Sequence, residues 1–252
     1  MAEAPVTQPG SGVRFDWGLT GAAELGRICS VLVVVDVLSF TTSVSVAVSR
    51  GTRVYPFPWD SQAAEYARRV GATVAAPRRG ATPEHPWSLS PAALANAPFV
   101  PSLVLPSPNG SAICSAAGST GVSVVAGCLR NARAVSRWLL AQGYGTVDRP
   151  IGVIAAGEHW PNGMLRPSVE DLLGAATVLD GLVAAEGGLS VEAAVALAAY
   201  SGVPDISAAV RGSVSAGELR DMGFAADVDI AAQRNVSDVV PILRNDSFIP
   251  AV

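Results

Sequence analysis

The feature that most constrains the fold is a series of short apolar runs that alternate with stretches of helical character. The six runs are "VLVVV" (31–35), "RVYPF" (53–57), "TVAAP" (73–77), "SLVLP" (102–106), "VSVVAG" (122–127) and "IGVIAAG" (151–157). Most are apolar at every position, which is typical of strands that are covered by helices on both faces. The alternation therefore predicts a three-layer α/β/α fold with a largely parallel or mixed sheet.

Helices are expected between these strands. The clearest cover residues 60–71, 130–143 and 168–188. The segment 38–51 is ambiguous because it is rich in β-branched residues. Phe40, Val44 and Val48 lie four apart in it, and a right-handed crossover between parallel strands favours a helix there.

The chain is expected to form one domain over residues 1–252, with an alternative division near residue 187 into an α/β core and a helical C-terminal part. Short helices are predicted at 190–200 and 215–223. The run "DVVPIL" (238–243) is predicted to be an edge strand, because proline cannot donate to a central ladder. Residues 78–101 are predicted to form a long loop that contains a short helix.

Composition excludes several partners. The net charge of −4, without a basic block, argues against nucleic acid. No window supplies the roughly 18 uncharged apolar residues that a membrane span needs. The N-terminus lacks the features of a signal peptide, so a cytoplasmic location is expected. Half of the residues are hydrophobic and only 15% are charged, which suggests apolar surface buried in the fold or against a second copy in a homo-oligomer.

Residue types narrow the chemistry further. Lysine is absent, which excludes a P-loop lysine and a Schiff-base lysine. The two histidines, His85 and His159, are too few for a multi-histidine zinc site. A Ser-His-Asp triad would lack the G-x-S-x-G elbow. The three cysteines are widely spaced and are expected to be reduced and mostly buried.

Ligands of open α/β sheets bind beyond the carboxyl ends of the strands, and four polar clusters fall there. They are Asp36 with Ser39, Thr41 and Thr42; "SPNGS" (107–111); "CLRN" (128–131), in which Asn131 is a candidate substrate ligand; and 157–171. We expect these loops to converge although they are distant in sequence.

Asp36 follows an apolar strand directly. A carboxylate there must be exposed, hydrogen-bonded or bound to a metal, and hard divalent cations prefer carboxylate oxygens. The alternative is a cap for the next helix. Glu170 and Asp171 lie in the first turn of a predicted helix, where Ser168 and Asp171 could instead form a capping box.

The turn "SPNGS" combines small side chains with an Asn-Gly pair. Asn109 and Gly110 readily adopt positive φ, which would let backbone N–H groups meet an anion, with Ser107 and Ser111 beside them. The alternative is an ordinary strand-to-helix turn. Similarly, "TT" at 41–42 either binds an anion at a helix N-terminus or makes ordinary first-turn contacts.

Two further residues are candidates for catalysis. Glu158 follows a strand directly and is a candidate acid, base or ligand. Cys128 lies beside Arg130 and is a candidate thiolate, although a small buried filler is the favoured interpretation.

Five stretches together resemble the 2-phosphosulfolactate phosphatase family. They are "VVVDVLSFTTSV", "SPNGSA", "VAGCLRNARAV", "AAGE…SVEDLLGAA" and "SAGELRDMGFAADVDIAAQRNVSDVVPIL". The resemblance implies Mg²⁺-dependent hydrolysis of 2-phospho-3-sulfolactate to 3-sulfolactate and phosphate, on a route to coenzyme M. It further implies that Asp36, Glu170 and Asp171 hold the metal, while Thr41, Thr42 and the "SPNGS" backbone hold phosphate.

The chain departs from the family pattern at one informative position. Ser39 stands where members commonly have arginine, whereas Arg78 and Arg79 follow the predicted strand 73–77. We expect at least one of these two side chains to supply the cation missing at Ser39; the alternative is a solvated pair. Two alternatives for function stay open: a phosphohydrolase for another phosphorylated acid, and a non-catalytic anion-binding homologue.

Overall fold

The computed structural model describes residues 5–251 and confirms the predicted α/β/α class. Its main sheet comprises β1 (Val13–Trp17), β2 (Val31–Val35), β3 (Arg53–Pro58), β4 (Thr73–Val74), β5 (Ser102–Ser107), β6 (Ser123–Gly127), β7 (Ile151–Ala155), β10 (Pro241–Arg244) and β11 (Ser247–Pro250). The strand order is β1-β7-β2-β6-β10-β11-β3-β5-β4. A separate hairpin pairs β8 (Glu158–His159) with β9 (Leu165–Arg166).

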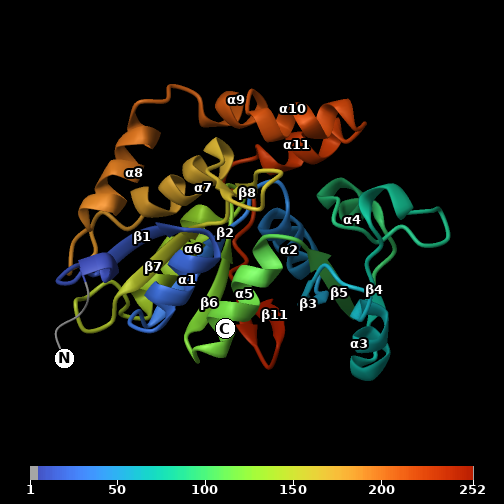
Figure 1. Ribbon diagram of the computed structural model, residues 1–252, viewed down its shortest axis with the longest axis horizontal. Coiled ribbons are helices and arrows are strands. Elements are labelled where there is room, and N and C mark those ends of the chain that lie inside the picture. The colour runs from blue at the N-terminus through green and yellow to red at the C-terminus, as the bar shows by residue number, and fades with distance from the viewer. Residues whose placement is uncertain (1–4, 252) are drawn as a thin grey trace.

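Helices surround this sheet (Figure 1). The helices that precede β7 are α1 (Gly18–Gly26), α2 (Phe40–Ser49), α3 (Ala63–Val70), α4 (Pro91–Asn96), α5 (Gly110–Ser119) and α6 (Ala132–Ala141). Those that follow it are α7 (Val169–Asp180), α8 (Val191–Ser201), α9 (Ile206–Arg211), α10 (Val214–Asp221) and α11 (Ala225–Ala231). Single turns of 3₁₀-helix cover Pro5–Thr7 and Arg78–Gly80. The ambiguous segment 38–51 is helical, as the crossover argument predicted.

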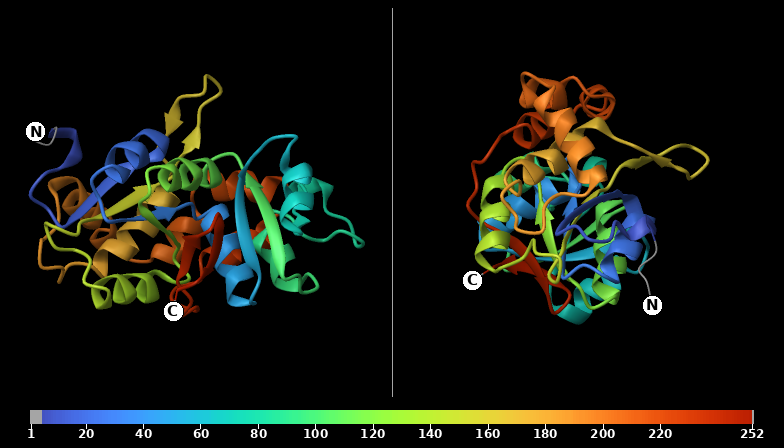
Figure 2. Two further views of the ribbon diagram at one scale, coloured as in Figure 1. Left: turned by 90° about the horizontal axis from the view of Figure 1, so that it is seen from below. Right: turned by 90° about the vertical axis from the view of Figure 1, so that its left-hand side faces the viewer.

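The sheet consists of two parallel groups that run in opposite directions. Strands β1, β7, β2 and β6 are mutually parallel, as are β3, β5 and β4. The antiparallel hairpin β10–β11 joins the groups through single residue pairs, Ile242 with Val125 and Phe248 with Val54. Figure 2 shows the strands of the two groups running in clearly different directions. The loops after β2 and β5 nevertheless meet, as expected, because the N–H of Gly110 bonds to the carboxylate of Asp36.

The continuous apolar character of β2 follows from its burial on both faces. Val31, Val33 and Val35 pack in one core cluster with side chains of α6 and α7. Leu32 and Val34 point the other way and pack with side chains of α1 and α5. Each fully buried side chain of this kind stabilises the fold by about 1.5–3 kcal/mol. This burial fixes the end of β2, and thus Asp36, in the middle of the sheet.

The C-terminal part is mainly helical, as predicted. The helices α8 to α11 lie along one side of the molecule (Figure 1). Ala193, Ile206 and Ala216 from this part pack in the same core cluster as β2. In the described range, no helix combines the length and the apolar character needed to cross a membrane.

Several element bounds differ from prediction. Strand β10 is an interior strand, so the edge position predicted for 238–243 is wrong. Pro241 is tolerated because it is the first residue of β10 and pairs with Pro250 at the end of β11, while the ladder to β6 begins at Ile242. The predicted strand 73–77 shortens to β4, and the predicted helix 168–188 ends at Asp180. β1 and β11 were not predicted.

Candidate active site

The carboxylate of Asp36 joins the two halves of the sheet. It follows β2, and its Oδ1 accepts a hydrogen bond of 3.0 Å from the backbone N–H of Phe40, the first residue of α2. Its Oδ2 accepts a second, also of 3.0 Å, from the N–H of Gly110, the first residue of α5. Helix N-termini favour negative charge. Asp36 therefore caps a helix, as one interpretation of the sequence predicted. It caps two helices at once, and these follow strands of the two groups that run in opposite directions.

Gly110 explains the small residues of the "SPNGS" turn. A Cβ at this position would lie 2.5 Å from Cδ1 of Phe40 and 2.7 Å from Oδ2 of Asp36. Only glycine lets the backbone N–H approach the carboxylate this closely. The anion that the turn meets is therefore a side chain of the protein itself.

Asp171 makes the corresponding connection for the β7 loop. Its Oδ1 accepts from the N–H of Val37 at 2.7 Å, and its Oδ2 accepts from the N–H of Gly157 at 2.9 Å. The capping box with Ser168 is not formed, since the Ser168 side chain does not cap α7. Asp171 instead ties the loops after β2 and β7 to the start of α7.

These carboxyl groups form a buried acidic cluster with Glu170. Asp36, Glu170 and Asp171 are 6%, 2% and 4% exposed. Burial, together with the negative charges of Asp36 and Glu170, raises the pKa of Asp171 well above its usual range. Burial also raises the pKa of Asp36, against the opposing effect of its two backbone hydrogen bonds and of Arg78. Both shifts favour the neutral, protonated forms of these buried carboxyl groups.

Glu158 lies at the rim of this cluster. Its Oε2 accepts a hydrogen bond of 2.8 Å from Asn109 Nδ2. The same amide's Oδ1 accepts from Nδ1 of His159 at 2.9 Å. Burial and the charge of Asp36 raise the pKa of Glu158 to about 7. A carboxyl with such a pKa exchanges a proton near neutral pH, as a general acid or base must. Both Glu158 and His159 lie at the base of the β8–β9 hairpin, which projects from the body of the protein (Figure 2).

The hydroxyl groups predicted to hold an anion are engaged elsewhere. Thr41 and Thr42 are fully buried and donate to the carbonyls of Asp36 and Val37, both at 2.8 Å. Ser111 donates to the carbonyl of Ser107 at 2.6 Å. These hydroxyl protons are not free for a phosphate, so their visible contribution is to shape the turns. Ser107 itself is buried at the end of β5.

Arg78 reaches the position opposite Ser39. Its Nη2 donates to the Ser39 hydroxyl, and its Nε donates to Oδ2 of Asp227 at 3.2 Å. Asp227, in α11, is almost fully buried. Its Oδ1 accepts from the Ser90 hydroxyl and from the N–H of Ala92. The guanidinium is thus held at the site from behind, and among the described residues no hydrogen bond uses its Nη1.

The second arginine of the pair, Arg79, is exposed. A third arginine near the site, Arg166, was not predicted from the sequence. Arg166, the cross-strand neighbour of Glu158 in the hairpin, carries a charge that acts on the Glu158 carboxyl. Its Nη2 pairs with Glu218 at 3.3 Å. The pairing of residues 158 and 166 in a two-residue ladder has no sequence signal strong enough to predict it. Asp227 was likewise missed, because its partners come from remote segments.

The loop after β6 does not join the cluster. Asn131 is fully buried, and its Oδ1 accepts from the N–H of Cys128 at 2.9 Å. Its Nδ2 donates to the carbonyls of Ala126 and Val239. Cys128 is also fully buried, and burial raises the pKa of its thiol. The structure therefore supports a packing role for Cys128 and a turn-holding role for Asn131.

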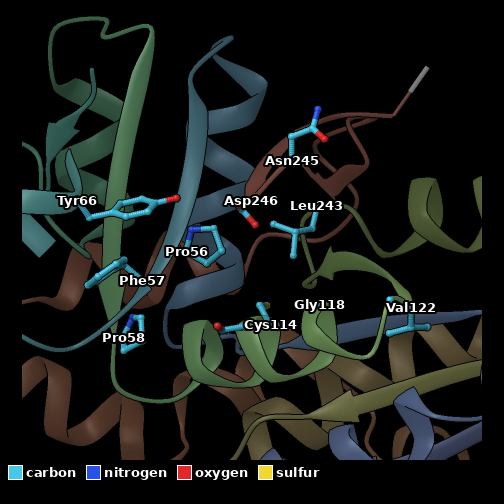
Figure 3. A pocket seen from close by; sticks show the side chains of 12 residues that line it. Pro56, Phe57, Pro58, Tyr66, Cys114, Gly118, Val122, Leu243, Asn245 and Asp246 are labelled. Carbon is cyan, nitrogen blue, oxygen red and sulfur yellow. The ribbon is translucent and has the colours of Figure 1, made fainter. Parts of the chain in front are cut away.

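A separate cavity of about 510 Å³ lies between β3, α5 and the β10–β11 turn, and none of the predicted site residues lines it. Figure 3 shows Tyr66 and Asp246 facing it from different elements. Asp246 is the one charged side chain among its lining residues. In the part of the chain that the structure describes, no cationic side chain lines this cavity to bind a phosphate ester, whereas Arg78 lies at the acidic cluster.

An α/β/α sheet that carries buried carboxyl groups, a carboxyl with a pKa near neutrality and a held guanidinium at its strand ends has the features of an enzyme that acts on small anionic molecules. The model of the 2-phosphosulpholactate phosphatase family matches residues 21–246, and the chain belongs to this family of phosphoric monoester hydrolases.

Two curated relatives carry the family's name. The 2-phosphosulfolactate phosphatase of Methanothermobacter thermautotrophicus is 29% identical over 219 residues, which cover 84% of this chain and 86% of that protein. A protein of Deinococcus radiodurans named "Probable 2-phosphosulfolactate phosphatase" is 30% identical over 151 residues, or 59% of each chain.

Proposed function

We propose that this protein hydrolyses a small anionic phosphate monoester. The first candidate substrate is 2-phospho-3-sulfolactate, because both curated relatives are named as phosphatases of this compound. In this reaction the P–O bond to the organic group breaks, water supplies the new oxygen on phosphorus, and the leaving oxygen takes up a proton. The family's route to coenzyme M and a cytoplasmic location are parts of the same proposal.

The observation that carries the proposal is the state of Glu158. With a pKa of about 7, the carboxyl is protonated in part of the molecules at neutral pH and can give its proton to the leaving oxygen. Asn109 fixes the orientation of this carboxyl through its 2.8 Å hydrogen bond. Arg78 offers a guanidinium to an acidic group of the substrate, for which bidentate pairing is the favoured geometry.

The donor chemistry of the acidic cluster suits Mg²⁺. Asp36, Glu170 and Asp171 supply hard oxygen atoms from buried carboxyl groups. In the described residues no three such side chains are already gathered around one point, so ligand positions would have to be completed by water or by substrate oxygens. When bound, Mg²⁺ would supply positive charge against the phosphoryl oxygens. A rise in melting temperature on adding Mg²⁺, abolished in Glu170→Gln, would support this site without reference to activity.

The deciding experiment is a phosphate-release screen over small phosphorylated acids with Mg²⁺, including 2-phosphosulfolactate and 2-phospholactate. Wild-type protein should release phosphate, and Glu158→Gln should lower kcat about a hundredfold or more, in the range of general acid catalysis. Arg78→Ala should raise KM, whereas Arg68→Ala, which removes an exposed arginine in α3, serves as the control. Full activity in Glu158→Gln would contradict the assignment of the proton donor.

A second candidate is a phosphatase of the same mechanism for a different phosphorylated acid. The observation that favours it is the cation at the site, which comes from Arg78 in the loop after β4 and reaches Ser39 from outside. A guanidinium that reaches the site from Arg78, and not from position 39, pairs best with an acid of a different shape. The screen distinguishes the two candidates by their relative kcat/KM.

A further inference from the structure

A cavity of about 430 Å³ adjoins the candidate site on the side of Arg78. It shares Arg78 with the site, and it shares Pro108 with the "SPNGS" turn that places Gly110 against Asp36. We call it the Trp59 cavity. Its size is in the range of small-molecule pockets. Arg78 thus lines this cavity and also contacts Ser39 at the candidate site.

The walls of the Trp59 cavity are unusually apolar for a position at the surface. The apolar lining residues are Trp59, Pro77, Leu89, Pro108, Met222 and Phe224. Trp59 is 49% exposed and Met222 is 42% exposed, although neither residue type favours water. Such side chains gathered around one hollow from separate loops mark a binding surface more often than a scattered exposed residue does.

The charges of the cavity all have one sign. Arg78 and Arg79 are its charged lining residues, and no carboxylate is among them. Asp227 holds Arg78 through an ion pair, and the guanidinium carbon of Arg78 lies 6.0 Å from the centroid of the Phe224 ring. This combination of guanidinium groups and apolar walls complements an organic acid that has an apolar body.

We propose that the Trp59 cavity receives the apolar substituent of the substrate, so that the substrates of this protein include phosphate esters of 2-hydroxy acids with an aromatic or branched aliphatic side chain. The inference rests on the proposed function. The phosphoryl group lies toward Asp36, the carboxylate pairs with Arg78, and the side chain packs against Trp59 and Met222. Hydrolysis proceeds as before, with water adding to phosphorus and the hydroxy acid leaving.

The test compares 2-phospho-3-phenyllactate with 2-phospholactate, which differ by the phenyl ring alone. The wild-type protein should show a kcat/KM at least about tenfold higher for the phenyl compound, since hydrophobic pockets discriminate groups of this size by tenfold or more. The double variant Trp59→Ala, Met222→Ala should lose this preference but keep its activity on 2-phospholactate. Phe99→Ala, which removes an exposed aromatic ring outside this cavity, should keep both.

Equal or lower kcat/KM for the phenyl compound in the wild type would overturn the inference, as would equal losses on both substrates in the double variant. Failure of the proposed function looks different, because then neither compound releases phosphate. In that case calorimetric titration of the same two compounds decides. Binding of the phenyl compound at least tenfold tighter, lost in the double variant, supports the cavity assignment; equal affinities refute it.

Discussion

The N–H of Gly110 donates a hydrogen bond to Oδ2 of Asp36 across 74 positions of sequence. This contact brings the start of α5, from one group of parallel strands, to the end of β2, from the other. Because the two groups run in opposite directions, no common sheet edge unites these loops. The buried carboxylate does so, by accepting from the first N–H of both α2 and α5.

Substitution of Gly110 by alanine should therefore be destabilising. The added methyl would meet Phe40 at 2.5 Å and Asp36 at 2.7 Å, and such overpacking costs about 1–3 kcal/mol. The free energy of unfolding in urea measures the loss. Gly118→Ala in the same helix is the control, because its nearest neighbour would lie at 3.4 Å. That variant should be neutral or slightly more stable. Equal stability of both variants would contradict the close approach at Gly110.

The stability of the protein should fall as the pH rises through the titration of Glu158. Its pKa is about 7 in the fold against an ordinary value of 4.5. Between these two values the folded state binds more protons than the unfolded chain, so the free energy of unfolding decreases with rising pH. The raised pKa values of Asp36 and Asp171 act in the same direction.

We expect the melting temperature to drop by a few degrees between pH 5 and pH 8 in the absence of divalent cations. Glu158→Gln should flatten part of this slope, whereas substitution of the exposed Glu186 by glutamine should leave it unchanged. A melting temperature that rises over this interval would show that the surroundings of Glu158 do not favour its neutral form.

Asp227 should act on the substrate only through Arg78. Asp227→Asn weakens the support of the guanidinium, so we expect KM to rise roughly tenfold or more, the equivalent of about 1.5–3 kcal/mol for hydrogen bonds to charged groups. The value of kcat should change less than threefold, because Asp227 lies behind Arg78. The control is Asp229→Asn in the same helix, which removes an exposed pair with Arg211 and should have no effect. A loss confined to kcat would refute the positioning role.

Cys128 should be dispensable for turnover. Its thiol is buried, and burial raises its pKa, so little reactive thiolate forms at neutral pH. Cys128→Ala should keep kcat within about twofold. A thousandfold loss, with the fold retained by circular dichroism, would instead establish a covalent thiol mechanism.

Much of the secondary structure was predictable because it depends on neighbours in sequence. The run 31–35 is buried on both faces and is strand β2 without a change of bounds. The repeat of Phe40, Val44 and Val48 and the crossover rule predicted α2. Prediction failed where local sequence is neutral: β1 and β11 are short, and β10 is interior although its first residue is Pro241.

For the site, the sequence by itself determined the residue types: carboxyl groups after strands, an Asn-Gly turn and a pair of arginines in place of an arginine at Ser39. Only the tertiary structure decided their tasks. Asp171 bonds to Val37 from 134 positions away, and Asp227 holds Arg78 from 149 positions away. A strand or turn signal records what the chain does within a few residues. The partner of a buried charge is selected by packing, since only the folded chain shows which polar groups are excluded from water together.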